Sequence, residues 1–501
     1  MPSHDTSDQI SFCCCVCPHG GDRLADEFRC AAPGSDPANV SAASARTSER
    51  RCSRGRRAGA PCQPTPYGQN QNCWPESGPG CNSLPFRYRI ARVMEHQTTV
   101  PGAPFQVSDG SRSARALGLL AYVVITVSFI DTMAQLPVLS PFAASLGAGA
   151  TMIGVILATY SLANMLGNLG AGVIVDRCGR RAGIIGGMAT AGIAVALYAV
   201  VLTPGQLIAL RALHGLGGAV LVPAAFAYAA DISGSRRAGR SMGYSGAAVG
   251  IAALIGPAGG GVLRSIFGFA PLFITLAALM AITALLVMAL LPESYREERT
   301  EQRHSFRERL VPLLRNPALH FALIAVFCVQ FAMGALAHSL PLGIEALGYS
   351  AARTGMLFSV FSFVAIMLFV LPTAGLSDRY GRPRVTRLGL ALMAVGLTMV
   401  TLSGTLGAMT LAMMVYGAGY GFVFPALCAT VVDQTGPANR GTGFGVFYAV
   451  FSLGVAVGPI AAGVATDAGV RPLGAVAAVL LAAQLLLVLQ QLFARRTRPA
   501  A

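Results

Sequence analysis

From residue 114 onward, long apolar segments alternate with short polar connectors. A helix that crosses a lipid bilayer needs about 20 predominantly apolar residues. Glycine and proline within such a helix are tolerated because neighbouring helices satisfy the freed backbone groups. The chain is therefore predicted to be an all-α integral membrane protein with twelve transmembrane helices. Their expected limits are 115–139, 150–174, 182–202, 206–230, 241–263, 270–291, 318–342, 353–375, 385–404, 406–431, 442–465 and 472–493.

Composition agrees with this prediction and excludes an ordinary water-soluble enzyme. Only 12% of the residues are charged, whereas soluble domains carry about 25%. The net charge is +15, and every basic residue other than histidine is an arginine. Of the arginines after residue 93, 22 lie in the N-terminal lead, alternate connectors and C-terminal tail, against 3 on the opposite side. This asymmetry predicts that both termini are cytoplasmic in a plasma membrane. The positive charge is therefore explained by membrane topology rather than by nucleic-acid binding.

Residues 1–93 differ in composition from the rest of the chain. They hold 9 of the 12 cysteines and no apolar run that could build a core. We expect a disordered or non-native extension, with synthesis beginning at Met94. The alternative is a metal or redox module that uses Cys14 and Cys17, but the second ligand pair of a zinc site is missing. The sequence therefore predicts no metal site and no cofactor.

The remaining residues form two copies of one unit. An offset of 202 residues maps Asp176 onto Asp378, Arg180 onto Arg382, Pro223 onto Pro425 and Asp231 onto Asp433. We expect a six-helix bundle over 94–291, a charged cytoplasmic linker over 292–317, and a second six-helix bundle with a short tail over 318–501. Two pseudo-symmetric bundles with a site at their interface are a transporter architecture.

The connector after the second apolar segment reads Gly172-Val-Ile-Val-Asp176-Arg177-Cys-Gly179-Arg180-Arg181. With Arg211 and the Gly256-Pro257 motif described below, it resembles the major facilitator superfamily, and within it the twelve-helix drug:proton antiporter branch. The resemblance implies a conformational latch of Asp176, Arg177, Gly179, Arg180 and Asp231 that joins the two bundles in one state of an alternating-access cycle. The alternative is that these arginines only determine topology.

The second copy of this signature holds Asp378, Arg379 and Arg382. It departs from the pattern, because Gly375 lies three rather than four residues before Asp378 and Pro383 replaces the last arginine. We therefore expect a weaker latch there.

Asp131 and Arg211 are the opposite charges that lie well inside the first bundle. At about 1.5 Å per residue they lie roughly 13 Å and 9 Å below the same membrane face, and a charge at such depth requires a partner. The sequence predicts that they pair directly, with Asp131 as a protonation or cation-recognition site and Arg211 adjusting how readily it takes up a proton. The alternative is a purely structural ion pair. His214, His320 and His338 are left outside this site.

The fifth apolar segment carries a motif of small residues that resembles the antiporter signature. Small residues let helices approach closely, and proline bends a helix. Its residues are Gly243, Gly256, Pro257, Gly260 and Gly261. Apolar and aromatic residues that could line a substrate cavity are Phe129, Met133, Tyr160, Phe327, Phe331, Met333, Phe358, Phe361, Tyr416, Tyr420 and Phe424.

The predicted function is secondary active transport by alternating access, with proton-coupled efflux of small amphipathic compounds. No phosphate-binding loop is present to supply ATP as the energy source. The expected partners are a small-molecule substrate, protons and the lipid bilayer, and the protein is expected to be a monomer. The alternatives are a proton-coupled transporter of sugars or organic anions, and a transport-inactive receptor of the same fold. A membrane enzyme is disfavoured because no nucleophile, base or metal cluster is evident.

Overall fold

The protein is described here from a computed structural model, which covers residues 112–233, 238–294, 316–371, 375–435 and 440–496. All described residues belong to the unit Met94–Ala501. The predictions of an N-terminal extension, its cysteine motif and most of the charged linker lie outside the described residues.

Twelve long helices make up the described part of the chain, together with two short ones, α3 (Leu139–Ser145) and α12 (Leu376–Tyr380). The first six are α2 (Arg112–Ala134), α4 (Ala150–Cys178), α5 (Arg180–Tyr198), α6 (Pro204–Ser233), α7 (Ala238–Phe267) and α8 (Phe269–Leu290). The second six are α10 (Pro317–Ala346), α11 (Ala351–Val370), α13 (Arg382–Leu402), α14 (Leu406–Gln434), α15 (Arg440–Asp467) and α16 (Pro472–Arg496).

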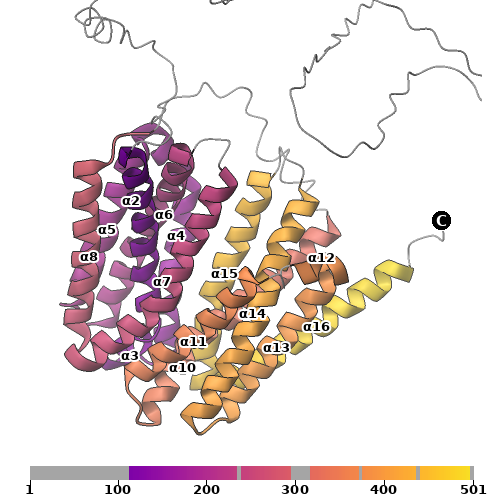
Figure 1. The fold of residues 1–501 in the computed structure, drawn as a ribbon. Helices are drawn as coiled ribbons and strands as arrows, with labels where there is room; N and C mark the ends of the chain where they lie inside the picture. The colour runs from indigo at the N-terminus through magenta and orange to yellow at the C-terminus, as the bar shows by residue number, and fades with distance from the viewer. Residues whose placement is uncertain (1–111, 234–237, 295–315, 372–374, 436–439, 497–501) are drawn as a thin grey trace, which may run out of the picture. The chain divides into compact units, whose positions relative to one another are not determined.

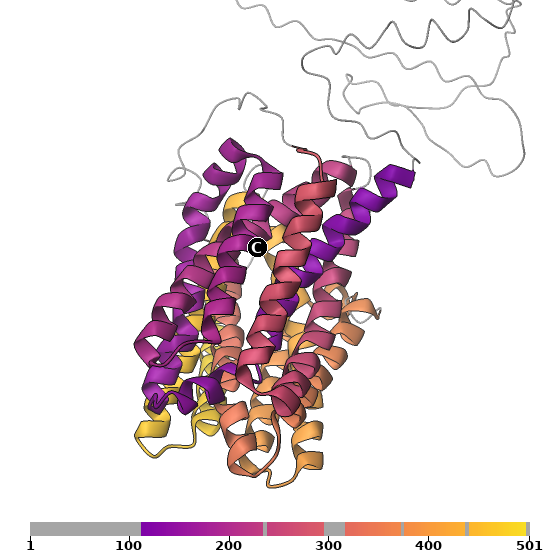
Figure 2. The ribbon, with the colours of Figure 1, turned by 90° about the vertical axis from the view of Figure 1, so that its left-hand side faces the viewer.

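Each six-helix set packs in the same way. In the first, α6 packs against α4 and α5, and α2 packs against α7. In the second, α14 packs against α11 and α13, and α10 packs against α15. The two sets are coloured indigo to rose and orange to yellow in Figure 1, and Figure 2 views them from the side of the first set. This arrangement confirms the all-α fold of two pseudo-symmetric bundles.

The expected and observed helix ends differ most at the first and eighth predicted helices, and proline accounts for both differences. The first helix ends at Ala134 rather than at 139, because Pro137 lacks the N–H that would continue it. The chain turns through residues 135–138 and resumes as α3. Likewise, α11 ends at Val370 rather than at 375, just before Pro372. Asp131 therefore lies in the last turn of α2.

The surfaces of these helices are apolar where a soluble protein would be polar. Leu169, Leu402 and Val370 are 82%, 72% and 75% exposed, and such exposure of large side chains marks contact with lipid or a partner. Among the described residues, eleven helices are long and apolar enough to cross a membrane, and the apolar part of α16 spans Pro472–Leu486.

Candidate functional site

A cluster of polar side chains lies buried inside the first bundle, between α2, α4, α5 and α6. Arg211 and His214 are three residues apart, so they project from one face of α6. Asp131 projects toward them from the last turn of α2. Their exposed fractions are 7%, 1% and 2% respectively. Charges this deeply buried are unfavourable unless other groups compensate them.

The carboxylate of Asp131 is bound at both oxygens. Nε2 of His214 lies 2.6 Å from Oδ2 of Asp131, and the side-chain amide of Gln135 donates to Oδ1 over 3.0 Å. The other ring nitrogen of His214, Nδ1, lies 3.1 Å from the hydroxyl of Tyr198. A continuous chain of side chains therefore runs from Gln135 through Asp131 and His214 to Tyr198.

Arg211 contacts this chain at both ends, through Gln135 and through the hydroxyl of Tyr198. Its Nη1 donates to Oε1 of Gln135 over 3.2 Å, and its Nε and Nη2 donate to the backbone carbonyls of Ile156 and Leu157 over 3.4 and 3.5 Å. Its guanidinium also lies 4.8 Å from the centre of the Tyr160 ring, a favourable cation–π distance. Asp131 and Arg211, which the sequence predicts to be partners, are therefore linked through the Gln135 amide rather than by a direct ion pair.

Glycines on α6 allow the surrounding helices to close on this cluster. A side chain on Gly217 would collide with the backbone of Ala191 on α5, and one on Gly215 would collide with the backbone of Tyr160 on α4. The close approach of α4 and α5 is what surrounds His214 with Tyr160 and Tyr198. In the sequence, the spacing between His214 and Arg211 could have indicated that His214 belongs to this cluster. Nothing in the sequence marks Tyr198 or Gln135 as members of it.

The corresponding region of the second bundle is apolar. The offset of 202 residues maps Asp131, Arg211 and His214 onto Met333, Met413 and Tyr416. Around Tyr416 lies a set of aromatic rings, including Phe361 at 5.5 Å between ring centres. Tyr420 and Phe424 extend it as a stacked pair, 5.6 Å apart. The two bundles therefore differ in chemistry at equivalent positions, the first being charged and the second aromatic.

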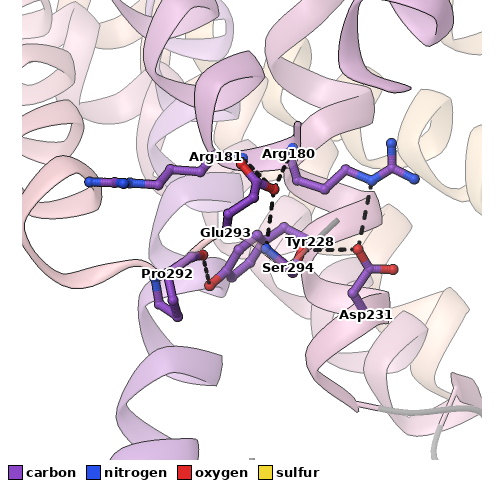
Figure 3. A network of polar contacts seen from close by, with 7 residues as sticks. All are labelled: Arg180, Arg181, Tyr228, Asp231, Pro292, Glu293 and Ser294. Atoms are coloured by element: carbon purple, nitrogen blue, oxygen red, sulfur yellow. Dashed lines mark hydrogen bonds and ion pairs between the residues drawn. The ribbon is translucent and has the colours of Figure 1, made fainter. Parts of the chain in front are cut away.

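A second polar cluster lies where the chain passes from α4 to α5 (Figure 3). Gly179 adopts a φ of +92° between the two helices, a conformation that suits glycine. The carboxylate of Glu293, just after α8, accepts from the backbone N–H groups of Arg180 and Arg181 at 2.8 and 3.1 Å. It thereby caps the N-terminus of α5.

Asp231 at the end of α6 completes this cluster. Its Oδ2 lies 3.6 Å from Nε of Arg180 and accepts from the Ser294 hydroxyl over 3.0 Å. Asp231 therefore lies beside the connector between α4 and α5, as the sequence predicts, whereas nothing in the sequence indicates the role of Glu293. Arg177 is exposed, and the side chain of Asp176 lies outside the described residues.

The second copy of this cluster surrounds Arg382 at the start of α13. Its Nε lies 3.2 Å from Oδ2 of Asp433, and its Nη1 pairs with Asp378 and donates to Ser377. Arg379 lies over the neighbouring Tyr380 ring, 5.6 Å from its centre. Arg382 thus lies between two carboxylates, and the weaker latch expected here stays a prediction. The ion pairs of both copies join helices of the same bundle.

The bundles contact one another mainly through α4 against α15 and α7 against α11. The closest backbone approaches lie near the start of α4 and the end of α15, far along the helices from the arginine clusters. A side chain on Gly154 or Gly463 would collide there with the backbone of Pro459 or of Ala150. We refer to this end as the arginine-poor end and to the end that carries Arg180 and Arg382 as the arginine-rich end.

The second interface repeats the first by symmetry. Side chains on Gly261 of α7 and Gly355 of α11 would collide with the backbones of Ala351 and Pro257. Polar contacts join the bundles at the same end: Thr151 donates to Asp467 through its backbone N–H and its hydroxyl, over 3.1 and 2.6 Å. The described structure is therefore closed at the arginine-poor end.

The family model of the Major Facilitator Superfamily matches residues 121–371 and 322–501, and these overlapping matches together span both bundles. The chain belongs to the Major Facilitator Superfamily. It is thus a transmembrane transporter, which confirms the family resemblance of the connector motif.

Relatives in this superfamily include proteins named for drug resistance. The chain is 26% identical over 354 residues to Multidrug resistance protein 2 of Bacillus subtilis (strain 168), which covers 69% of this chain and 88% of that protein. It is 29% identical over 324 residues to the class C tetracycline resistance protein of Escherichia coli, covering 62% of this chain and 79% of that protein.

Solved structures share the superfamily fold. A bacterial homologue of the human lysosomal transporter Spinster, in an inward-facing and unoccupied conformation, matches with a TM-score of 0.62 at 16% identity. That match covers 76% of this chain and 96% of the other. The nucleoside transporter NupG matches with a TM-score of 0.63 at 16% identity, covering 76% of this chain and all of the other.

The glycine motif of α7 packs against two other helices, α2 and α11. A side chain on Gly256 would lie 2.9 Å from Cβ of Met133, and one on Gly260 would collide with the backbone of Ala134. Gly261 and Pro257 face α11 instead, as described above. Gly243 has open space around it. The motif therefore packs α7 onto the turn of α2 that carries Asp131 and also onto the second bundle.

Proposed function

We propose that this transporter exports small amphipathic compounds in exchange for protons, and that the buried cluster containing Asp131 takes up the proton that couples the two fluxes. The observation that carries the proposal is the buried chain of Gln135, Asp131 and His214 beside Arg211. The relatives named for multidrug and tetracycline resistance support the substrate class.

The charge balance of this cluster explains how a proton could drive a conformational change. With Asp131 ionised, its negative charge offsets that of Arg211, and the buried cluster has little net charge. An added proton leaves one positive charge without a counterion. A buried, uncompensated charge costs several kcal/mol, so the loaded cluster favours a state in which water reaches it. A proton gradient can in this way bias which side of the transporter is open.

The proposed orientation follows from the arginines. The arginine-rich end faces the cytoplasm under the positive-inside rule, which makes both termini cytoplasmic and the described state open toward the cell interior. The clusters around Arg180 and Arg382 then lie at the open end. In the opposite state we propose that they latch the two bundles together.

The substrate is proposed to bind between the charged first bundle and the aromatic second bundle. The rings around Tyr420 and Phe424 provide flat apolar surface, which suits aromatic amphipathic compounds. Sugars would need several polar partners on both bundles, and the residues equivalent to Asp131 and Arg211 in the second bundle are methionines. The protein is proposed to work as a monomer, with both bundles supplied by one chain.

The test is transport by the full chain in proteoliposomes with an imposed pH gradient, with ethidium and tetracycline as substrates. The Asp131→Asn variant keeps a side chain that can accept from Gln135 but cannot carry a proton. It should lose uphill accumulation while retaining downhill exchange. Met333→Asn, at the equivalent place in the second bundle, introduces the same amide and should retain uphill accumulation.

Two outcomes would overturn the proposal. Uphill transport by Asp131→Asn with an unchanged pH dependence would remove Asp131 from the coupling step. Absence of any flux by the wild-type protein, for either compound and in either direction, would favour the receptor alternative.

A further inference from the structure

His214 lies outside the proton site predicted from the sequence, but the structure places it in direct contact with Asp131. We infer that His214 and Asp131 hold the transported proton together, with His214 as the group that takes it up. This inference rests on the proposed proton coupling and adds a residue to it. The inference depends on residue 214 of α6 being a histidine.

The first step of the argument is the geometry of the ring. Both nitrogens of His214 have a partner that can either donate or accept as required. Nε2–H donates to Oδ2 of Asp131 over 2.6 Å, and the Tyr198 hydroxyl lies 3.1 Å from Nδ1. A hydroxyl both donates and accepts. The neutral ring is therefore satisfied by Tyr198 donating to Nδ1, with Asp131 ionised.

Proton uptake changes one contact and breaks none. A proton from water binds at Nδ1, and the Tyr198 hydroxyl turns from donor to acceptor. The imidazolium then donates from Nδ1 to Tyr198 and from Nε2 to Asp131. Release reverses the step, so that one proton enters and leaves per cycle. If Asp131 took the proton at Oδ2, Nε2 of His214 would have to change from donor to acceptor.

The second step is the set of groups that face the ring. Asp131 on α2 is the one carboxylate against it in the described residues, and Arg211 lies one turn before it on α6. From α4, Tyr160 packs edge-on at 4.8 Å between ring centres. From α5 comes Tyr198, and behind it lies the apolar Phe273 of α8 at 5.3 Å. Asp131 is thus placed to stabilise an imidazolium by direct contact.

The third step is chemical. Histidine is the side chain that ordinarily changes charge between pH 5 and 8, whereas an ordinary aspartate does so near pH 4. The equivalent residue of the second bundle, Tyr416, is fully buried among aromatic rings, so the pair belongs to the first bundle.

The first test is independent of transport. Infrared difference spectra between pH 5 and pH 8 report whether a proton lies on an imidazole or on a carboxyl group. For the full chain in liposomes, the wild type should show imidazolium signals that the His214→Gln variant loses. In that variant, the C=O stretch of a protonated Asp131 should appear only at the acid limit. His320→Gln, which changes an exposed histidine of α10, should leave the His214 signals in place.

The second test is the pH profile of uphill ethidium transport. Glutamine retains a donor that can reach Asp131, so His214→Gln should keep the substrate KM within about twofold. Its half-maximal pH should move toward acid by roughly one unit or more, because only the carboxyl group remains to titrate. Tyr198→Phe removes the acceptor of the loaded ring and should shift the profile in the same direction by less. A purely structural histidine would lower the rate equally at every pH.

The outcomes separate the two proposals. A protonated Asp131 in the wild type near neutral pH, unaffected by His214→Gln, would overturn the role of His214 while leaving proton coupling intact. A pH profile of His214→Gln that coincides with that of His320→Gln would also overturn the role of His214. If His214→Gln does not fold, an unshifted pH profile of Tyr198→Phe would overturn that role instead. If the wild type shows no proton-driven transport, the proposed function fails, and the infrared spectra still decide whether the pair shares a proton.

Discussion

Replacing Gly463 with alanine should destabilise the closed arginine-poor end. The added methyl group would lie 2.7 Å from both the carbonyl carbon of Ala150 and Cα of Thr151. Both are backbone atoms, so no rotamer change can relieve the contact. The start of α4 must retreat by at least about 0.7 Å to reach ordinary contact distance, because the carbonyl oxygen of Ala150 lies nearer still. This retreat also strains the Thr151–Asp467 hydrogen bonds, one helical turn away.

Overpacking of this kind typically costs about 1–3 kcal/mol, which corresponds to a roughly 5- to 150-fold shift in a two-state equilibrium. The cost applies only to the state that is closed at this end, because the other state separates these helices. Gly463→Ala should therefore shift the population toward opening at the arginine-poor end. Gly261→Ala, the symmetric substitution, should act in the same direction.

The assay is the distance distribution between spin labels at Ala144 and Ala468, which are both exposed, in a chain whose native cysteines are replaced by serine. The short-distance population should fall in Gly463→Ala. Gly343→Ala is the matched control, since that glycine lies on α10 with open space around it. A distribution for Gly463→Ala that matches the control would refute the argument that backbone contact at Gly463 holds this end closed.

Two further substitutions test the ends of the bundles. Glu293→Gln weakens the cap of α5 and should cost about 0.5–2 kcal/mol, lowering the thermal midpoint in detergent without changing substrate affinity; an unchanged midpoint would contradict the capping role. Arg264→Ala removes a 3.0 Å ion pair with Glu345 that joins α7 to α10. Because that pair is partly exposed, the closed state should lose about 1 kcal/mol or less. This loss should become smaller in high salt when the same spin-label distances are measured. A loss that does not change with salt would contradict its assignment to this ion pair.

Local patterns were sufficient to predict the number of helices, the two copies and the contact between Asp231 and the arginine connector. Hydropathy determines where a helix can cross a membrane, and the offset of 202 residues is visible without any structure. The helix ends at Ala134 and Val370 were misplaced because apolar composition continues past the point where Pro137 and Pro372 stop the hydrogen-bond ladder.

The site itself could be predicted only in part. Asp131 and Arg211 were identifiable because charges are rare in membrane helices, but their direct pairing did not follow. Gln135 and Tyr198 are ordinary residues in the sequence, and neither marks itself as a partner of a buried charge. They join the site because α2, α5 and α6 pack together and bring side chains from distant parts of the chain into hydrogen-bonding distance.

The sequence by itself determined that this chain crosses the membrane, that it does so as two related halves, and on which side the arginines gather. Each of these depends on properties that add along the chain, namely apolar length, repeat spacing and charge count. Tertiary structure alone decided which groups surround Asp131 and which end is closed. Those depend on helix faces and on backbone approaches at glycines such as Gly154 and Gly463, which are set by how helices pack rather than by the composition of any one of them.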